Sequence, residues 1–146
     1  MKIRDIRKNE PIQLQTISPD KTIHQAIQQL CQFNIGALPV VDAGGALVGI
    51  LSERDVLRLC ARSDCQNALA SRVADVMTVN LVIGVLDDDL EYVMRVMTEK
   101  RVRHFPVLEG RKLVAMISIG DVVKAQYLQK ETEARFLRDY MAGATT

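Results

Sequence analysis

The chain repeats itself, and this duplication limits its possible folds more than any other feature of the sequence. Two segments recur in the same order: Ile35–Asp42 returns as Val102–Glu109, and Leu47–Val56 returns as Leu113–Val122. The copies differ in length between these segments, where residues 43–46 face the shorter stretch 110–112. Length changes collect in surface turns. Two similar halves predict two copies of one structural unit.

Both copies predict a helix followed by a hairpin. Apolar residues recur with helical spacing at Ile23, Ala26, Ile27, Leu30 and Cys31, and again at Leu90, Val93, Met94 and Met97. In the first copy, two short apolar runs follow, residues 38–41 and 47–51, with a Gly-Gly turn between them. They predict a hairpin of buried strands. A second helix is expected from a Ser-x-x-Asp element that follows each hairpin.

Each unit is therefore expected to run β-α-β-β-α, which makes the chain α/β of the α+β type. One unit alone leaves an apolar face uncovered, so two units are expected to pack as a pseudo-two-fold module. We place the first unit at residues 1–66, the second at 67–125 and a long C-terminal helical extension at 126–146. The polar stretch 63–72 is expected to link the halves.

The C-terminal helix is predicted to end in an apolar group. Phe136, Leu137, Tyr140 and Met141 follow the polar stretch 129–135, and Gly143 is the expected stop. This apolar end needs a surface to pack on. The sequence leaves two alternatives open, a partner subunit and the helix's own domain.

Composition disfavours several classes of function. The formal net charge of +1 argues against binding to DNA, RNA or an anionic membrane. The sequence has no run of 18 apolar residues that would predict a membrane span, and its start lacks the apolar stretch of a secretory signal. Cys31, Cys60 and Cys65 lack CxxC spacing, which predicts neither a disulfide framework nor a zinc site and favours the cytoplasm. Cys31 is expected in the core.

The Ser-x-x-Asp element, at Ser52–Asp55 and Ser118–Asp121, has two interpretations. A serine before a helix with an acid three residues later is a capping box, which needs no ligand. Alternatively, the free N–H groups of a helix start favour phosphate oxygens, and the aspartate can accept hydrogen bonds from two ribose hydroxyls. Because the element occurs twice at matched positions, the second interpretation predicts a symmetric pair of ligand sites.

Neighbouring residues could complete such a site. Pro39 and Pro106 lack an N–H, so extended backbone around them could offer unpaired groups to a base, with Ile35, Leu38 and Phe105 as walls. The candidates for phosphate contact are Arg54, Arg101, Arg103, His104 and Lys124. Each also has an ordinary interpretation, because a lone arginine is usually a solvated charge and His104 fits an edge strand.

The sequence lacks the motifs of common enzymes. It contains no Gly-rich phosphate loop of the Walker kind and no G-x-G-x-x-G after a strand. The two histidines belong to no Ser-His-Asp set and no metal cluster. We therefore expect a protein that is not an enzyme, with no catalytic residues and no metal.

The repeated motifs resemble a known family. Gly36–Asp42 followed by Leu47–Asp55 is similar to a CBS domain, named for cystathionine β-synthase, and Arg101–Val107 followed by Ser118–Val123 is similar to a second one. The stretch Ser-Ile-Gly-Asp-Val-Val resembles small stand-alone CBS-pair proteins of bacteria and plant organelles. The resemblance implies a module that binds AMP, ADP, ATP, S-adenosylmethionine or NAD(H) in clefts between its two units.

The resemblance also implies roles for particular residues. Asp55 and Asp121 match the family's ribose-binding aspartate, and Thr16 matches a threonine near the ligand, whereas the second copy has Ile83 there. The two clefts are therefore expected to differ. The full set of predicted nucleotide-binding residues is Thr16, Ala37, Leu38, Pro39, Ser52, Arg54, Asp55, Arg103, His104, Phe105, Pro106, Ser118, Gly120 and Asp121.

The sequence thus predicts a regulatory module that senses AMP, ATP or NAD(H), requires no cofactor and transmits its ligand state to a partner protein. The resemblance further implies a flat homodimer. The alternative is a structural interaction module without a ligand. In that case the two Ser-x-x-Asp elements are only helix caps, and the C-terminal helix and dimer surface are the working parts.

Overall fold

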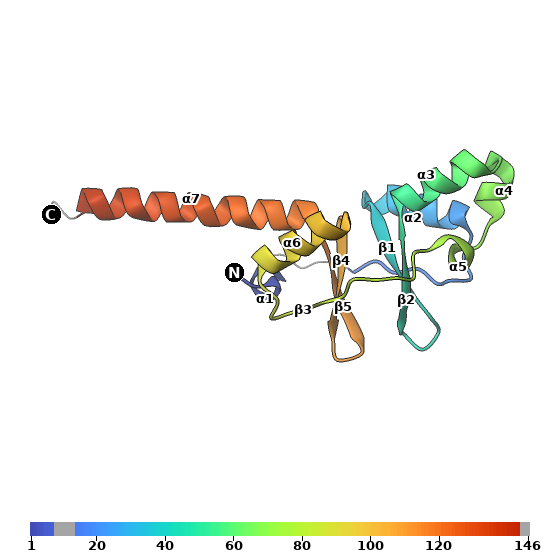
Figure 1. Cartoon of the computed structure of the whole chain (residues 1–146), viewed down its shortest axis with the longest axis horizontal. Coiled ribbons are helices and arrows are strands. Elements are labelled where there is room, and N and C mark those ends of the chain that lie inside the picture. The colour runs from blue at the N-terminus through green and yellow to red at the C-terminus, as the bar shows by residue number, and fades with distance from the viewer. Residues whose placement is uncertain (8–13, 144–146) are drawn as a thin grey trace.

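The computed structural model describes residues 1–7 and 14–143, which form helices and strands in the order expected of a duplicated α+β unit (Figure 1). The helices are α1 (Ile3–Arg7), α2 (Ile23–Phe33), α3 (Glu53–Arg62), α4 (Cys65–Ala70), α5 (Val73–Val76), α6 (Leu90–Lys100) and α7 (Ile119–Gly143). The strands are β1 (Ala37–Val41), β2 (Leu47–Ser52), β3 (Gly84–Val85), β4 (His104–Glu109) and β5 (Lys112–Ser118).

The two predicted hairpins are confirmed. Strand β1 pairs with β2 and β4 pairs with β5, both antiparallel, and each pair has one irregularity in register near its turn. The first strand of each unit is much shorter than the pattern β-α-β-β-α suggests. It consists of β3, two residues parallel to β4, in the second unit, and of a single bridge between Ile17 and Val40 in the first. The hairpins stand side by side with their turns at the same edge (Figure 1).

Helix α2 illustrates how the local sequence determines where a helix begins and ends and which of its faces is buried. Thr22 and Gln25 form a capping box at its start, and Asn34 ends it in the left-handed conformation. Its buried residues are Ile23, Ala26 and Leu30, as the apolar spacing predicts. The prediction that Cys31 lies in the core is wrong, because Cys31 is exposed. At 100° per residue, position 31 is turned well away from the direction of Ile23 and the core.

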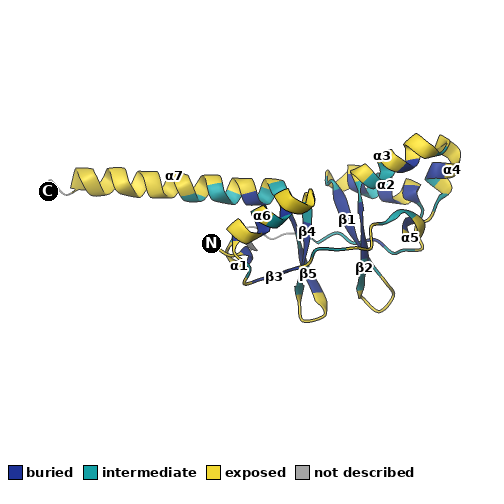
Figure 2. Cartoon of the chain, in the orientation of Figure 1, coloured by how far each residue is buried: buried dark blue, intermediate teal, exposed yellow. Residues whose placement is uncertain are grey.

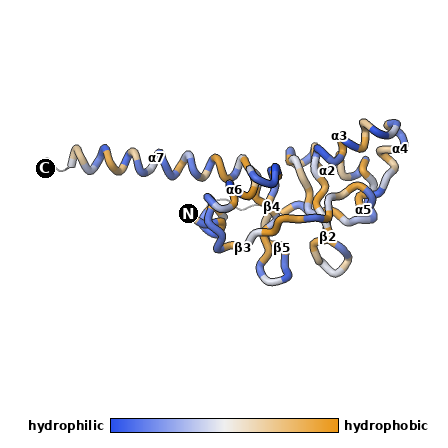
Figure 3. The backbone as a smooth tube through the Cα atoms, in the orientation of Figure 1, coloured by the Kyte–Doolittle hydropathy of each residue, from blue (hydrophilic) through white to orange (hydrophobic). Residues whose placement is uncertain are grey.

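Two hydrophobic cores lie where the helices cover the hairpins, and the figures show burial and hydropathy concentrated there (Figures 2 and 3). One core gathers residues from Ile17 to Val73, and the other gathers residues from Leu86 to Val122 together with Ile3. Ile3 has no exposed surface. The first residues of the chain therefore pack in the core of the second unit, whereas Val73 packs in the core of the first.

This exchange of starting segments follows the pseudo-two-fold symmetry. Helix α1 binds the segment before α6, and α5 binds the corresponding segment before α2. Three backbone hydrogen bonds of α1 each have a counterpart at α5. Ile3 N–H donates to Asp88 C=O and Arg4 N–H to Leu86 C=O, as Val73 N–H donates to Lys21 C=O and Ala74 N–H to Pro19 C=O. In the third pair, Leu90 N–H donates to Met1 C=O, as Ile23 N–H donates to Ser71 C=O. Helices α1 and α5 therefore pack in the opposite units from those to which the predicted boundary at residue 66 assigns them. The boundary itself stays a prediction.

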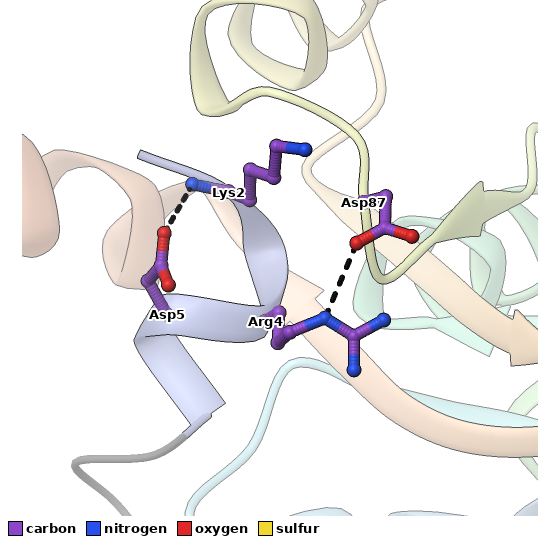
Figure 4. Close-up of polar contacts among 4 residues, drawn as sticks. All are labelled: Lys2, Arg4, Asp5 and Asp87. Atoms are coloured by element: carbon purple, nitrogen blue, oxygen red, sulfur yellow. Dashed lines mark hydrogen bonds and ion pairs between the residues drawn. The ribbon is translucent and has the colours of Figure 1, made fainter.

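One side-chain contact adds to the attachment of α1 and another stabilises the helix itself (Figure 4). The Arg4 Nε donates to Asp87 Oδ1 at 3.2 Å, whereas the backbone N–H of Lys2 donates to Asp5 Oδ2 at 2.8 Å within the start of α1. The hydrogen bond and positive charge of Arg4 lower the pKa of Asp87. Both Arg4 and Asp87 are exposed, so this ion pair contributes little beside the burial of Ile3.

The linking stretch 63–72 contains a helix, α4, with Asp64 as its N-cap. The predicted C-terminal helix is also present, as α7, and it begins at Ile119 and ends at Gly143. Its first turns pack against α6 and β5, and the rest extends away from the two units (Figure 1). Within the described residues, no helix has the length and apolar content needed to cross a membrane.

Candidate functional site

The start of a helix lies beside the start of a proline-bearing strand in each unit. Strand β2 ends at Ser52, immediately before α3, and β5 ends at Ser118, immediately before α7. The strand register places Ala37 opposite Ser52 and His104 opposite Ser118. Residues that were predicted to share a site from two distant motifs are therefore neighbours, and the arrangement occurs twice.

Both Ser-x-x-Asp elements form capping boxes. In the first, the backbone N–H of Ser52 donates to Asp55 Oδ2 at 2.9 Å, and the backbone N–H of Asp55 donates to Ser52 Oγ at 3.3 Å. In the second, the corresponding distances between Ser118 and Asp121 are 2.8 and 3.1 Å. All four residues are half-buried. These bonds fix the carboxylates at the helix starts, which is the position that either interpretation of the element requires.

The carboxylate of Asp55 has a further partner that the sequence did not suggest. Thr78, which follows α5 and pairs with Ile50 on β2, donates its Oγ1 hydrogen to Asp55 Oδ1 at 3.1 Å. Within the described part of the chain, Asp121 Oδ1 has no such partner. A carboxylate offers about four lone-pair directions, so Asp55 keeps capacity for another donor, and the two aspartates are not equivalent.

Backbone groups of the two proline-bearing strands face away from their hairpin partners. Pro39 C=O accepts from Ile17 N–H at 3.1 Å, on the side of β1 opposite to β2. Because antiparallel strands alternate the direction of their backbone groups, the N–H and C=O of Ala37 point to that same side. His104 has the matching position on β4, which pairs with β5 and β3 in the same pattern. This arrangement fits the predicted backbone contacts to a base.

His104 lies at the junction of the two units. A Cβ added to Gly36 would lie 3.3 Å from Cε1 and Nε2 of the His104 ring and 3.5 Å from Cδ of Glu53. The ring of the second unit therefore packs on the backbone of the first, near the start of α3. Burial lowers the pKa of His104, while the carboxylates of Glu53 and Asp121 oppose this effect and Arg103 adds to it.

Thr16 lies beside β1, on the side opposite to β2. The parallel bridge between Ile17 and Val40 places Thr16 next to Pro39, and Gln29 Nε2 donates to the Thr16 carbonyl at 2.9 Å. Its predicted role near the ligand stays a prediction. Thr16 also lines a cavity of about 460 Å³ that both units share; its lining residues are Leu14, Thr16, Val41, Gly44, Gly45, Arg111, Lys112 and Leu113.

The interpretation of Leu38 and Phe105 as walls for a base needs correction. Both side chains have no exposed surface and belong to the two separate cores, because alternate residues of a strand point to opposite faces. Pro39 and Pro106 are also buried. Any ligand contact at these positions would therefore come from the backbone. Ile35 is only half-buried.

The basic candidates lie at the surface. Arg54, Arg103 and Lys124 are exposed, as is Gly120, which occupies the position of Arg54 in the second unit. Arg101 ends α6 in the left-handed conformation. Arg103 lies beside the start of α7, because its carbonyl accepts from Ile119 N–H at 2.8 Å. The carbonyl of Gly36 accepts from Glu53 N–H at 3.0 Å in the same way at the start of α3. Three residues near the candidate site were not predicted from the sequence: Thr78, Glu53 and Gly36. Gly36 could have been found, because it aligns with Arg103 in the second copy.

Two hairpin-and-helix units, each with a helix start beside a proline-bearing strand, define a duplicated module with two matched candidate sites. The CBS domain family matches residues 3–62 and 73–127. The chain therefore belongs to the CBS domain family and carries two CBS domains in tandem.

Known proteins resemble the chain over most of its length. It is 35% identical over 128 residues to CBS domain-containing protein CBSX3, mitochondrial, of Arabidopsis thaliana, covering 85% of this chain and 62% of the plant protein. The chain thus spans less than two thirds of that relative.

Among solved structures, a CBS-domain containing protein of Agrobacterium tumefaciens matches with a TM-score of 0.82 and 36% identity, covering 86% of this chain and 92% of that one. The structure of CBSX2 in complex with AMP matches with a TM-score of 0.74 and 27% identity, covering 88% and 98%.

Proposed function

We propose that the chain is a regulatory module that binds an adenine nucleotide at the junction of its two CBS units and transmits the bound state to a partner protein. The observation that carries the proposal is the pair of carboxylates, Asp55 and Asp121, each held at a helix start beside outward-facing strand backbone. Ribose hydroxyls would donate to these carboxylates, the backbone of residues 37 and 104 would meet the base, and the helix starts would favour phosphate.

The relative with bound AMP supports this class of ligand, because it shares the fold over most of both chains. We propose AMP, ATP or NAD(H) as the candidates. Exposed Arg54 and Arg103 flank the junction and would contact phosphate groups, whereas Gly120 offers no charge in the second unit. The two sites would therefore differ in affinity, with the Arg54 side favouring the more highly charged ligand.

Binding can regulate a partner only if the ligand prefers one of two arrangements of the module. His104 of one unit packs on Gly36 of the other, so a ligand at this junction would contact both units at once. We propose that it changes their relative position, and that the protein acts in the cytoplasm as a homodimer without catalysing a reaction. The predicted boundary at residue 66 would then separate two units that share each site, and the boundary at residue 125 would separate the second unit from the C-terminal helical extension.

Replacement of the aspartates tests the site. Asp55→Ala and Asp121→Ala should each weaken binding at their own site, because each removes the acceptor of charge-assisted bonds that contribute about 1.5–3 kcal/mol. This corresponds to roughly 10- to 150-fold in affinity. Isothermal calorimetry with AMP, ATP, NAD⁺ and NADH measures the change.

Asp64→Ala is the matched control. Asp64 is also an aspartate that caps a helix, since its Oδ1 accepts from Asn67 N–H at 2.8 Å, but it lies in α4's own cap and outside the proposed site. This variant should lose cap stability and retain nucleotide affinity. If Asp55→Ala and Asp121→Ala both keep full affinity, the two elements are helix caps only and the structural interaction module becomes the better account.

A further inference from the structure

The cavity of about 460 Å³ is lined by residues of both hairpin turns, which share one edge of the module (Figure 1). Apart from Leu14 and Thr16, its lining residues belong to the turns and to the strand ends beside them. Val41, at the cavity, is separated along β1 from Ala37 of the candidate nucleotide site by about 13 Å. Sites for small molecules have volumes of roughly 300–1,000 Å³. The cavity therefore has the size of a ligand site and reaches the end of the strands that is remote from the helix starts.

The walls of this cavity are mainly apolar. Leu14 and Val41 are half-buried and Leu113 is buried, so their side chains provide an apolar floor. The Thr16 hydroxyl has no hydrogen-bond partner among the described residues, whereas the Thr16 carbonyl accepts from Gln29. None of the lining residues is acidic. An apolar ligand body therefore matches these walls, and no lining carboxylate is present to attract a positive charge or to accept from the hydroxyls of a ribose.

Two neighbouring basic residues border the apolar floor. Arg111 and Lys112 are exposed, and within the described part of the chain neither forms an ion pair, although Glu109 lies opposite Lys112 in the strand register. Solvated basic residues are ordinary in turns, but both of these line a cavity whose lining residues carry no negative charge. A guanidinium presents a fork of N–H donors that fits a carboxylate or a phosphate group. The basic pair therefore provides a place for an anionic group at the margin of the cavity.

The turn of the first hairpin leaves this space open. Residues 43–46 include Gly44 and Gly45, which line the cavity without side chains, and no basic residue. The Asp42 carboxylate holds the turn, because its Oδ1 accepts from Gly44 N–H at 3.0 Å and from Ala46 N–H at 2.9 Å. These backbone donors are already used, so an anion in the cavity would be bound by the side chains of the second hairpin.

We propose that this cavity binds a small amphiphilic anion, a molecule with a carboxylate or phosphate group at one end and an apolar body at the other. Arg111 and Lys112 hold the anionic group, and the apolar body lies on Leu14, Val41 and Leu113. This site is distinct from the proposed nucleotide sites, and its ligand is of a different chemical class. The inference therefore goes beyond nucleotide binding and stands independently of it.

Titration of the isotope-labelled full-length chain with octyl phosphate, followed by NMR, tests the ligand class and the place of binding. We expect the amide signals of Gly44, Gly45 and Arg111 to move as the ligand is added. A parallel titration with octanoate separates the two anionic groups, and movement of these signals with either compound supports the proposal. Movement centred on Asp55 and Asp121 instead would place the anion at the nucleotide sites and overturn it, as would no movement with either compound.

The probes also separate the apolar contact from the charge. Butyl phosphate should bind more weakly than octyl phosphate, by about fourfold for each methylene group that no longer contacts the floor of the cavity. Octylamine, which has the same chain and the opposite charge, should not move the three amide signals. Equal affinities for octyl phosphate and inorganic phosphate would show a surface charge interaction only and would contradict the proposal.

A pair of double variants tests the basic residues. Arg111→Ala with Lys112→Ala changes two exposed positions, so the fold should be kept, and octyl phosphate should bind at least about tenfold more weakly. Lys130→Ala with Arg138→Ala is the matched control, because it removes the same two charges from exposed positions on α7. The control should retain affinity. An equal loss in both double variants would show a response to net charge alone and would overturn the proposed site.

Two further measurements keep this site separate from nucleotide binding. Asp55→Ala with Asp121→Ala should bind octyl phosphate as the native protein does, and Arg111→Ala with Lys112→Ala should retain the native affinity for AMP. Loss of octyl phosphate binding in the aspartate variant would contradict the cavity site. If the native protein binds octyl phosphate at the turns and does not bind AMP, the nucleotide proposal fails and the cavity site stands.

Discussion

Gly84 and Phe105 pack against each other in the second unit, at positions where the first unit has two other residues. In the first unit, Ile17 and Leu38 occupy the matching positions, and both are buried in its core. In the second unit the ring of Phe105 fills the space where a Cβ of Gly84 would stand. The larger residue on β4 is therefore accommodated by the smallest residue on β3. The two units therefore fill this part of their close-packed cores with different residues.

This compensation predicts the effect of Gly84→Ala. The added methyl group collides with the buried ring, so the variant should lose roughly 1–3 kcal/mol of unfolding free energy. In a chain that already carries Phe105→Leu, the same change should cost clearly less, because Leu is the residue that the first unit uses there. Urea unfolding of the four proteins of this cycle measures the coupling. Equal costs in both backgrounds would contradict the explanation.

His104 makes stability depend on pH. Burial against Gly36 lowers its pKa in the folded protein, and Arg103 adds to the effect, although Glu53 and Asp121 oppose it. The unfolded chain takes up a proton near pH 6.5, whereas the folded chain does so only at lower pH. The stabilisation is therefore complete above about pH 6.5 and is lost as the pH falls toward the lower folded-state pKa.

Thermal unfolding between pH 8 and pH 5 should show this loss in the native protein. His104→Gln, which cannot take up a proton, should show a flatter curve over the same range. If the two proteins lose stability in parallel, other groups cause the dependence.

At the scale of elements, the exchange of α1 and α5 is the main feature that links the two units. Ile3 is the third residue of the sequence and is fully buried in the core of the second unit. Ile3→Ala should therefore cost about 2–5 kcal/mol, as for other buried large-to-small changes. The same change would be neutral if α1 did not pack in the core. Denaturant unfolding distinguishes the two results.

The duplication was sufficient to predict the main helices and both hairpins, but neither the short helices α1, α4 and α5 nor the exchange of α1 and α5 between the units. The apolar spacing of α2 and α6, the two hairpins and the position of α7 follow from local pattern, and each is present in the structure. The similarity between Ile3–Ile6 and Val73–Val76 was visible in the sequence. It did not reveal that each segment packs in the other unit's core, because similarity between copies carries no information about which copy a segment contacts.

The candidate site was predictable to a similar extent. The repeat pointed to Asp55 and Asp121, because an acid three residues after a strand-ending serine is a local pattern. Thr78 was missed, since its bond to Asp55 depends on how the chain passes β2 after α5. Thr16 was expected near these residues, and the bridge of Ile17 with Val40 places it beside Pro39, where it also lines the cavity that reaches the hairpin turns.

At the scale of the whole molecule, the two units are similar in fold and different at their junction. His104 reaches across from the second unit to Gly36, whereas Ala37 holds the matching position in the first. Thr78 holds Asp55, and no described residue holds Asp121 in this way. A module built on these differences would bind ligands unequally at its two sites. Such a difference allows a ligand to favour one arrangement of the units.

Calorimetry on the native protein tests the central claim most directly. AMP, ATP, NAD⁺ and NADH are titrated separately into the full chain, at protein concentrations that detect micromolar binding. The account predicts heat of binding with at least one of these nucleotides and two sites of unequal affinity, or one filled site, in the fitted curve. The absence of heat with all four would contradict it.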